Sequence, residues 1–202
     1  MNKGCLIGGG IFLAIVVGLG LWLMGGYNSL VNSDENVKKS WANVESAYQR
    51  RADLIPGLVA TVKGAVGAEN KILTDVITAR ASATQMKIDP ANLTPEKLAE
   101  FQASQGQLSQ ALGRLMVVSE QYPQLKSIDG FNSLQSQLEG TENRIKIERD
   151  VFNAEVATYN KQVRSFPIVL VAGMMGFDKK GSFTADAGSS KAPKVDFNNE
   201  TN

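Results

Sequence analysis

The chain has 202 residues, with 21 basic and 20 acidic side chains and no histidine. This length suits one domain with an anchor, and the near balance of charge argues against nucleic-acid binding. Without histidine, Ser-His-Asp and Cys-His catalysis are excluded, and the single cysteine, Cys5, excludes an intrachain disulfide and a cysteine-rich zinc site. We therefore expect no catalytic residue, cofactor, metal or small-molecule substrate.

The N-terminal segment, residues 1–26, has the composition of a membrane anchor. Residues 4–33 carry no charged side chain, and the densest apolar stretch matches the roughly 20 residues that cross a bilayer as a helix. Lys3 precedes this stretch and the first charges after it cancel, which predicts a cytoplasmic N-terminus and a domain on the other side. A cleaved signal peptide is the alternative, although Gly25 and Gly26 form a poor cleavage site.

Small residues recur at every fourth position of the anchor, at Gly10, Ala14 and Gly18. Such a stripe lets transmembrane helices approach closely, so these residues are a predicted packing site between spans. The alternative is that glycine and alanine are simply common in membrane spans.

After the anchor, apolar residues alternate at spacings of four and three, beginning with Val37, Trp41, Val44 and Tyr48. This spacing is typical of helices packed side by side. The pattern continues without interruption past Pro56, which would allow one long helix. Because proline is costly inside a helix, we instead expect a break near residue 52, with Asp53 as the N-cap of a second helix over residues 53–86.

A third helix is expected from Thr94, as its N-cap, to Tyr122, and a fourth from Phe131 to Phe166. A proline follows the cap of the third helix, and another follows the end of the fourth. Short connections between four helices predict an all-α fold. Its expected form is an antiparallel up-and-down four-helix bundle with coiled-coil-like packing over residues 27–177.

A few polar residues interrupt the apolar seam, and we expect them to extend toward solvent or to pair with neighbours. A role in fixing helix register is the alternative. These residues are Arg51, Glu69, Gln105 and Glu148. A hydrolase using carboxylates alone would need two of them held close with unequal pKa values. The available carboxylates have no spacing that predicts a shared site: Asp53, Glu69, Glu142 and Glu148.

The segment after the fourth helix is apolar but too short to cross a bilayer. Its centre, Ile168, Val169, Leu170 and Val171, is a predicted assembly or docking surface. It can cap the bundle, lie on the membrane or bind another subunit. Residues 178–202 are rich in Gly, Ser, Lys and Asn, which predicts a flexible tail.

Several stretches, in order along the chain, closely resemble the LemA family. They are YNSLV (27–31), QRRADLIPGLVATVKG (49–64), LMVVSEQYPQLK (115–126), LQSQLEGTENRI (134–145) and YNKQVRSFP (159–167). The resemblance implies a bacterial membrane protein with a helical-bundle domain and no established activity. The chain departs from the family at Gly57, where an asparagine is frequent. That departure weakens the case for a side-chain-specific site there.

The expected function is a non-catalytic scaffold or adaptor, anchored by one span in the bacterial inner membrane, with its bundle on the periplasmic or extracellular side. Its expected partners are the lipid bilayer, further copies of the chain and other membrane proteins. An envelope-stress or sensory component acting through a membrane partner is the alternative, and a carboxylate-dependent hydrolase is a third, weaker hypothesis.

Overall fold

The computed structural model describes residues 3–66, 71–122, 125 and 128–184. Within these ranges the secondary structure is helical and contains no strand, which confirms the all-α class. The helices are α1 (Lys3–Val66), α2 (Lys71–Gln85), α3 (Pro95–Glu120) and α5 (Asp129–Arg164), followed by the 3-10 helices η1 (Ile168–Leu170) and η2 (Gly173–Met175).

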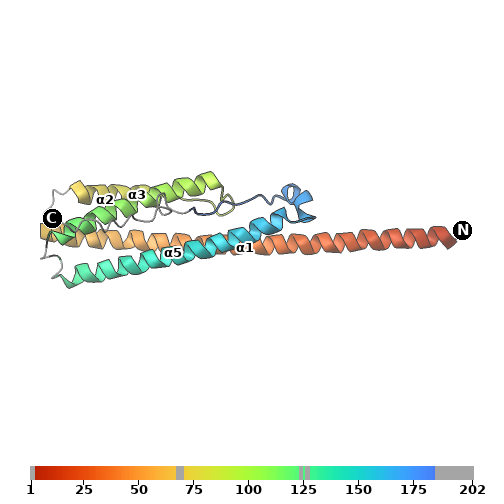
Figure 1. Cartoon of the computed structure of the whole chain (residues 1–202), viewed down its shortest axis with the longest axis horizontal. Coiled ribbons are helices and arrows are strands. Elements are labelled where there is room, and N and C mark those ends of the chain that lie inside the picture. Colours follow the sequence, from red (N-terminus) through yellow and green to blue (C-terminus); the bar gives the residue numbers. More distant parts are fainter. Residues whose placement is uncertain (1–2, 67–70, 123–124, 126–127, 185–202) are drawn as a thin grey trace, which may run out of the picture.

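The helices alternate in direction, as expected for an up-and-down bundle. In Figure 1, α1 runs the whole length of the molecule, α2 and α3 form a hairpin on one side, and α5 returns antiparallel to α1. The closest helix pairs are α1 with α5 and α2 with α3. Aromatic side chains join the two pairs, since Phe101 of α3 packs edge-on against Trp41 and Tyr48 of α1.

The N-terminal part of α1 projects beyond the bundle (Figure 1). Residues 9–25 are exposed. In the described part of the chain, α1 is the helix that is long and apolar enough to cross a membrane. A Cβ added at Gly10 or Gly18 would meet nothing within 4 Å. Close packing between spans through Gly10, Ala14 and Gly18 stays a prediction.

The predicted seam residues form the core. Val37, Trp41 and Val44 are completely buried, and Tyr48 is almost so. Buried apolar residues fall into two clusters. We call the one nearer the anchor, which contains Trp41, the proximal core, and the one at the far end of the bundle, which contains Leu58, the distal core.

The predicted break near Ala52 is wrong. Helix α1 continues through Pro56 to its end at Val66. Asp53 is therefore inside the helix rather than at its N-cap, and its exposed carboxylate accepts a hydrogen bond from Gln49 Nε2 at 2.7 Å. Pro56 has no backbone N–H, so it cannot donate the helical hydrogen bond that the carbonyl oxygen of Ala52 would normally accept.

Another helix supplies the missing donor. Arg80 Nε, on α2, donates to the carbonyl oxygen of Ala52 at 2.7 Å. The proline therefore leaves no unsatisfied carbonyl, which reduces its cost in the helix. The expected second helix over residues 53–86 is consequently divided between the end of α1 and α2.

The third and fourth helices agree with prediction to within a few residues. The backbone N–H of Lys97 lies 3.4 Å from Thr94 Oγ1, the position expected for an N-cap, and α3 begins at Pro95. Helix α5 ends at Arg164, shortly before the predicted stop at Pro167.

The prediction that residues 178–202 are flexible is wrong for residues 178–184, which we call the strap; residues 185–202 lie outside the described part. Phe183 is buried and stacks on Trp41 at 6.1 Å between ring centroids. The N–H of Gly181 donates to the carbonyl of Leu93 at 2.8 Å. The strap is thus part of the proximal core.

Two asparagines on α5 hold the strap in register. Asn153 exchanges two hydrogen bonds with the backbone of Phe183, and Asn160 exchanges two with the backbone of Lys180. Seven helical residues rise by about 10.5 Å, close to the roughly 10 Å covered by three extended residues. The helix and strap therefore match in length over this interval.

Candidate functional site

A polar layer separates the two cores, and Arg51 lies at its centre. On α1, Tyr48 belongs to the proximal core and Leu54 to the distal core, with Arg51 between them. The side chain of Arg51 is only 1% exposed. Because a buried guanidinium is strongly destabilising unless it is paired, its partners determine whether this layer is stable.

The guanidinium joins α1 to α3 and α5. Arg51 Nη1 donates to Ser109 Oγ at 2.9 Å and to Glu142 Oε1 at 2.7 Å. Its Nη2 donates to Gln105 Oε1 at 2.6 Å, and Gln105 Nε2 donates onward to the carbonyl of Ala83 on α2 at 3.1 Å. One charged side chain therefore connects all the α-helices of the described bundle, directly or through Gln105. Such a layer favours one alignment of the helices over others.

The described seam residues pair with neighbours, which is one of the two outcomes expected for them. Gln105 and Arg51 pair with each other, and buried Glu148 pairs with Arg144 at 2.7 Å. Glu69 lies outside the described residues. Each described carboxylate considered for hydrolysis pairs with a non-acidic side chain: Asp53 with Gln49, Glu142 with Arg51 and Glu148 with Arg144.

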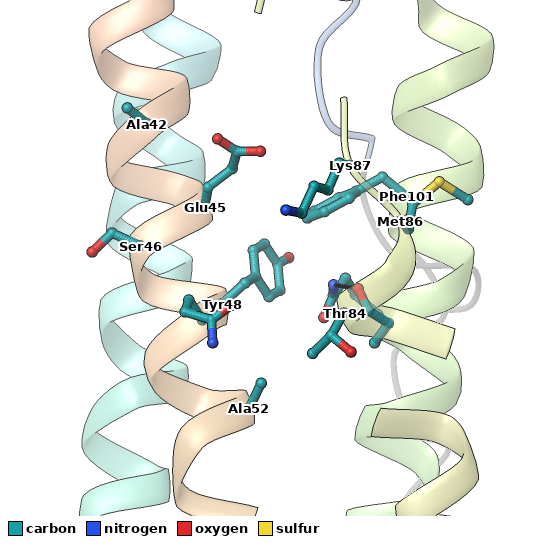
Figure 2. A pocket seen from close by; sticks show the side chains of 12 residues that line it. Ala42, Glu45, Ser46, Tyr48, Ala52, Thr84, Met86, Lys87 and Phe101 are labelled. Atoms are coloured by element: carbon teal, nitrogen blue, oxygen red, sulfur yellow. Dashed lines mark hydrogen bonds between the residues drawn. The ribbon is translucent and has the colours of Figure 1, made fainter. Parts of the chain in front are cut away.

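A cleft of about 420 Å³ opens beside the layer, between α1 and the chain around the α2–α3 connection (Figure 2). Glu45 and Tyr48 extend into it from α1, and Lys87 and Phe101 line the opposite side (Figure 2). A second cleft, of about 410 Å³, is lined by residues of α1, α3 and α5, including Arg51. Tyr48 lines both, so the layer lies between two recesses.

Sequence reasoning missed Glu45. Burial raises the pKa of its carboxyl, and the indole N–H of Trp41 and the ammonium of Lys87 act in the opposite direction. The Trp41 Nε1 atom is itself buried and lies outside hydrogen-bonding geometry with any described group. Glu45 is the single carboxylate among the residues lining this cleft, and general acid–base hydrolysis by carboxylates uses two.

An ionic cluster, also missed, fixes the strap to α1 near the anchor. Asp34 pairs with Lys38 at 2.8 Å and with strap residue Lys180 at 2.9 Å. Partial burial acts to raise the pKa of Asp34, but hydrogen bonds from the two ammonium groups outweigh it and the net pKa is lowered. Burial, and then the charges of Asp34 and Asp178, raise the pKa of Tyr159 to about 12.

The Tyr159 hydroxyl consequently keeps its proton at neutral pH and donates to the carbonyl of Asp178 at 2.9 Å. These groups stabilise the strap rather than present a reactive site. The sequence feature that could have indicated an ordered strap is Phe183, the one aromatic residue in this otherwise polar segment.

The predicted docking surface divides into two faces. Ile168 packs on the proximal core, and Val171 is half-buried. Val169 and Leu170 point outward, with 47% and 67% of their surfaces exposed. Among the described residues, no group of three or more His, Cys, Asp or Glu residues is placed to hold a metal ion.

These features define a class: a helical-bundle protein whose longest helix also carries an apolar segment long enough to cross a membrane. The chain belongs to the LemA family, whose model matches residues 40–197. That match includes the strap and most of the bundle.

Curated relatives extend the comparison. The chain is 28% identical over 174 residues to the magnetosome proteins MamQ 1 and MamQ 2 of Paramagnetospirillum magneticum, which covers 78% of this chain and 64% of each relative. It is 28% identical over 170 residues to the magnetosome protein MamQ of Magnetospirillum gryphiswaldense, covering 76% and 62%. The chain thus spans less than two thirds of the length of these relatives.

Proposed function

We propose that this protein is a non-catalytic scaffold or adaptor of the bacterial envelope, in which α1 acts as a rigid strut between the membrane and the far end of the bundle. The observation that carries the proposal is the continuity of α1 over 64 residues, through Pro56. The Arg80 bond to the carbonyl of Ala52 supports that continuity, because it satisfies the group that the proline leaves open.

The strut sets the height of the bundle. From the end of the apolar stretch at Met24 to Val66, a continuous helix rises by about 60 Å. The polar layer resists sliding of α3 and α5 along α1, since sliding would separate Arg51 from its partners. Faces of the bundle are therefore presented to other proteins at a fixed distance from the bilayer.

One such face lies on α5. Ile147 and Val151 are one helical turn apart and are 56% and 43% exposed. Apolar residues at this spacing are the usual contacts between a helix and a helical partner. We propose that a second copy or another membrane protein pairs here.

The basic flank at Lys3 supports a cytoplasmic N-terminus, with the bundle on the periplasmic or extracellular side of the inner membrane. The relatives' description as magnetosome proteins names a cellular structure rather than a reaction, which favours an assembly role over an enzymatic one.

Site-specific photocrosslinking in native membranes tests the proposal. A photoreactive amino acid placed at Ile147 or Val151 of the full-length chain should give discrete crosslinked products. The matched control is Lys146, which is also exposed on α5 but lies about 100° around the helix from Ile147 and about 140° from Val151. If the two apolar positions give no more product than Lys146, α5 does not present a docking face there, which contradicts the adaptor proposal.

A further inference from the structure

The chain after α5 forms a compact apolar unit beside α1, at the point where the anchor leaves the bundle (Figure 1). We call residues 166–176 the foot; they include η1 and η2. The position of the foot is fixed by contacts with α1 and the core. The side chain of Ile168 lies 3.2 Å from where a Cβ on Gly26 would be, and Ala172 is 2% exposed.

The opposite face of the foot is apolar and open. Phe166, Leu170 and Met174 are 80%, 67% and 88% exposed, and Val169 and Met175 add to the same segment. No charged residue occurs between Arg164 and Asp178. Exposed apolar surface of this density usually marks a contact surface, because water is an unfavourable neighbour for it.

The foot lies at the level where α1 would cross the edge of a bilayer. Gly26, which contacts the foot, immediately follows the apolar stretch of the anchor, and the next residue, Tyr27, packs edge-on against Phe177 at 5.6 Å between ring centroids. Trp22 and Tyr27 are both partly exposed, and such rings favour the headgroup layer. The first charges on α1 after the anchor are Asp34 and Glu35, two turns farther from the membrane.

The exposed face of the foot is therefore continuous with a surface that is already apolar, the exposed residues 9–25 of α1. A second protein docked on the foot would have to share this position with lipid. The bilayer itself needs no further partner, since the anchor holds it beside the foot at all times.

We propose that the foot inserts into the boundary between headgroups and acyl chains of the leaflet from which α1 emerges, with Phe166, Leu170 and Met174 as the inserted side chains. The proposal rests on the anchor invoked in the proposed function. The bundle then contacts the membrane at two places, the span and the foot, which fixes its tilt and its rotation about α1 as well as its height.

The test uses the full-length chain in phosphatidylcholine liposomes, with Cys5→Ser as background. An environment-sensitive fluorophore is attached through Leu170→Cys or Met174→Cys, and lipids carrying a nitroxide at a shallow or a deep acyl position act as quenchers. Both labels should be quenched, more strongly by the shallow nitroxide. A label at Asn143→Cys, on an exposed site of α5 toward the far end of the bundle, should not be quenched.

A second variant separates insertion from mere proximity. Leu170→Asp with Met174→Asp should abolish quenching of a label at Phe166→Cys. The helical circular dichroism signal should be unchanged, because both side chains are largely exposed, at 67% and 88%. Persistence of that quenching would overturn the proposal.

A label at Leu13→Cys keeps the two proposals distinguishable. If it is quenched while the foot labels stay in water, the foot proposal fails and the anchor stands. If neither is quenched, the anchor fails as well, and the proposed strut with it. Foot labels that are shielded only at high protein-to-lipid ratio, without lipid quenching, would assign the surface to a second copy and overturn membrane insertion.

Discussion

Neutralising Glu142 tests the ion pair between Arg51 and Glu142 in the polar layer. In Glu142→Gln, the guanidinium of Arg51 stays buried while its anionic partner among the described residues becomes neutral. The pair is asymmetric, because the Arg51 side chain is 1% exposed and the Glu142 side chain is 47% exposed. Water reaches the side chain at position 142 but not the guanidinium of Arg51. Solvation therefore cannot replace the interaction that Arg51 loses when Glu142 is neutralised.

The expected magnitude lies between two limits. Removing one partner of a fully buried pair costs about 3–5 kcal/mol, whereas surface pairs contribute about 0–1 kcal/mol. With one buried and one half-exposed partner, Glu142→Gln should lower the free energy of unfolding by about 1–3 kcal/mol. Arg51→Met should also destabilise, because the Gln105 Oε1 acceptor then lacks its donor, at a cost of about 1–3 kcal/mol.

The double variant carries the diagnostic result. Arg51→Met with Glu142→Gln removes the buried charge whose isolation makes the glutamine substitution costly. Its loss of stability should therefore fall short of the sum of the single losses by about 1–2 kcal/mol. Additive losses would contradict the assignment of Glu142 as the counter-ion of Arg51.

Urea denaturation of the full-length chain in detergent micelles measures these differences. The chain has two tryptophans, so Trp22→Phe leaves completely buried Trp41 as the reporter of the proximal core. Asp53→Asn is the matched control, since it neutralises an exposed carboxylate on α1 and should change stability by less than about 0.5 kcal/mol. Equal effects of Glu142→Gln and Asp53→Asn would refute the reasoning.

Two further predictions concern the strap. Gly181→Ala should lower stability by about 1–3 kcal/mol, because its Cβ would lie 2.8 Å from backbone atoms of Pro95, while Gly140→Ala, with nothing within 4 Å, should raise it by about 0.5–1 kcal/mol; similar thermal unfolding midpoints would contradict this. Because the pKa of Asp34 is lowered below 3.8, its pairing with Lys180 stabilises the strap above that pH and is lost as pH falls through the folded-state pKa. The protection factor of the Gly181 amide, which compares its exchange rate with the intrinsic rate at the same pH, should fall over that acid range, and already at neutral pH in Asp34→Asn; an unchanged protection factor in the variant would show that the ion pair does not hold the strap.

The helices and their buried faces could be predicted from the sequence, because the three-four spacing of apolar residues indicates both the helix and the face that it buries. Val37, Trp41 and Val44 follow the three-four alternation and are all buried. The cap at Thr94 was likewise a local signal, since a cap residue and the proline after it act within one turn.

Features that depend on distant residues were not predicted. Pro56 is tolerated in α1 because Arg80, on another helix, donates to the carbonyl of Ala52, and no local rule contains that bond. The polar composition of the strap indicated disorder, yet paired hydrogen bonds from Asn153 and Asn160 hold its backbone. In both cases a long-range hydrogen bond overrides a local tendency.

For the buried seam, the sequence identified the polar residues but did not predict that they form one hydrogen-bonded layer. Arg51 and Gln105 were expected to pair or extend toward solvent, and they pair. Their convergence with Glu142 depends on how the helices are aligned, which spacing along one helix does not specify. The split of the apolar segment into inward Ile168 and outward Leu170 follows from its 3-10 turns, which a run of consecutive apolar residues does not reveal.

The continuity of α1 is tested most directly by one distance in the full-length chain in lipid nanodiscs. Spin labels at Asn32→Cys and Ala60→Cys, both exposed positions on α1, are introduced in a Cys5→Ser background and measured by pulsed electron–electron double resonance. A continuous helix predicts a single narrow distribution near about 42 Å between the two backbones. A reversal near Ala52 would bring the labels to within about 20 Å and contradict the strut.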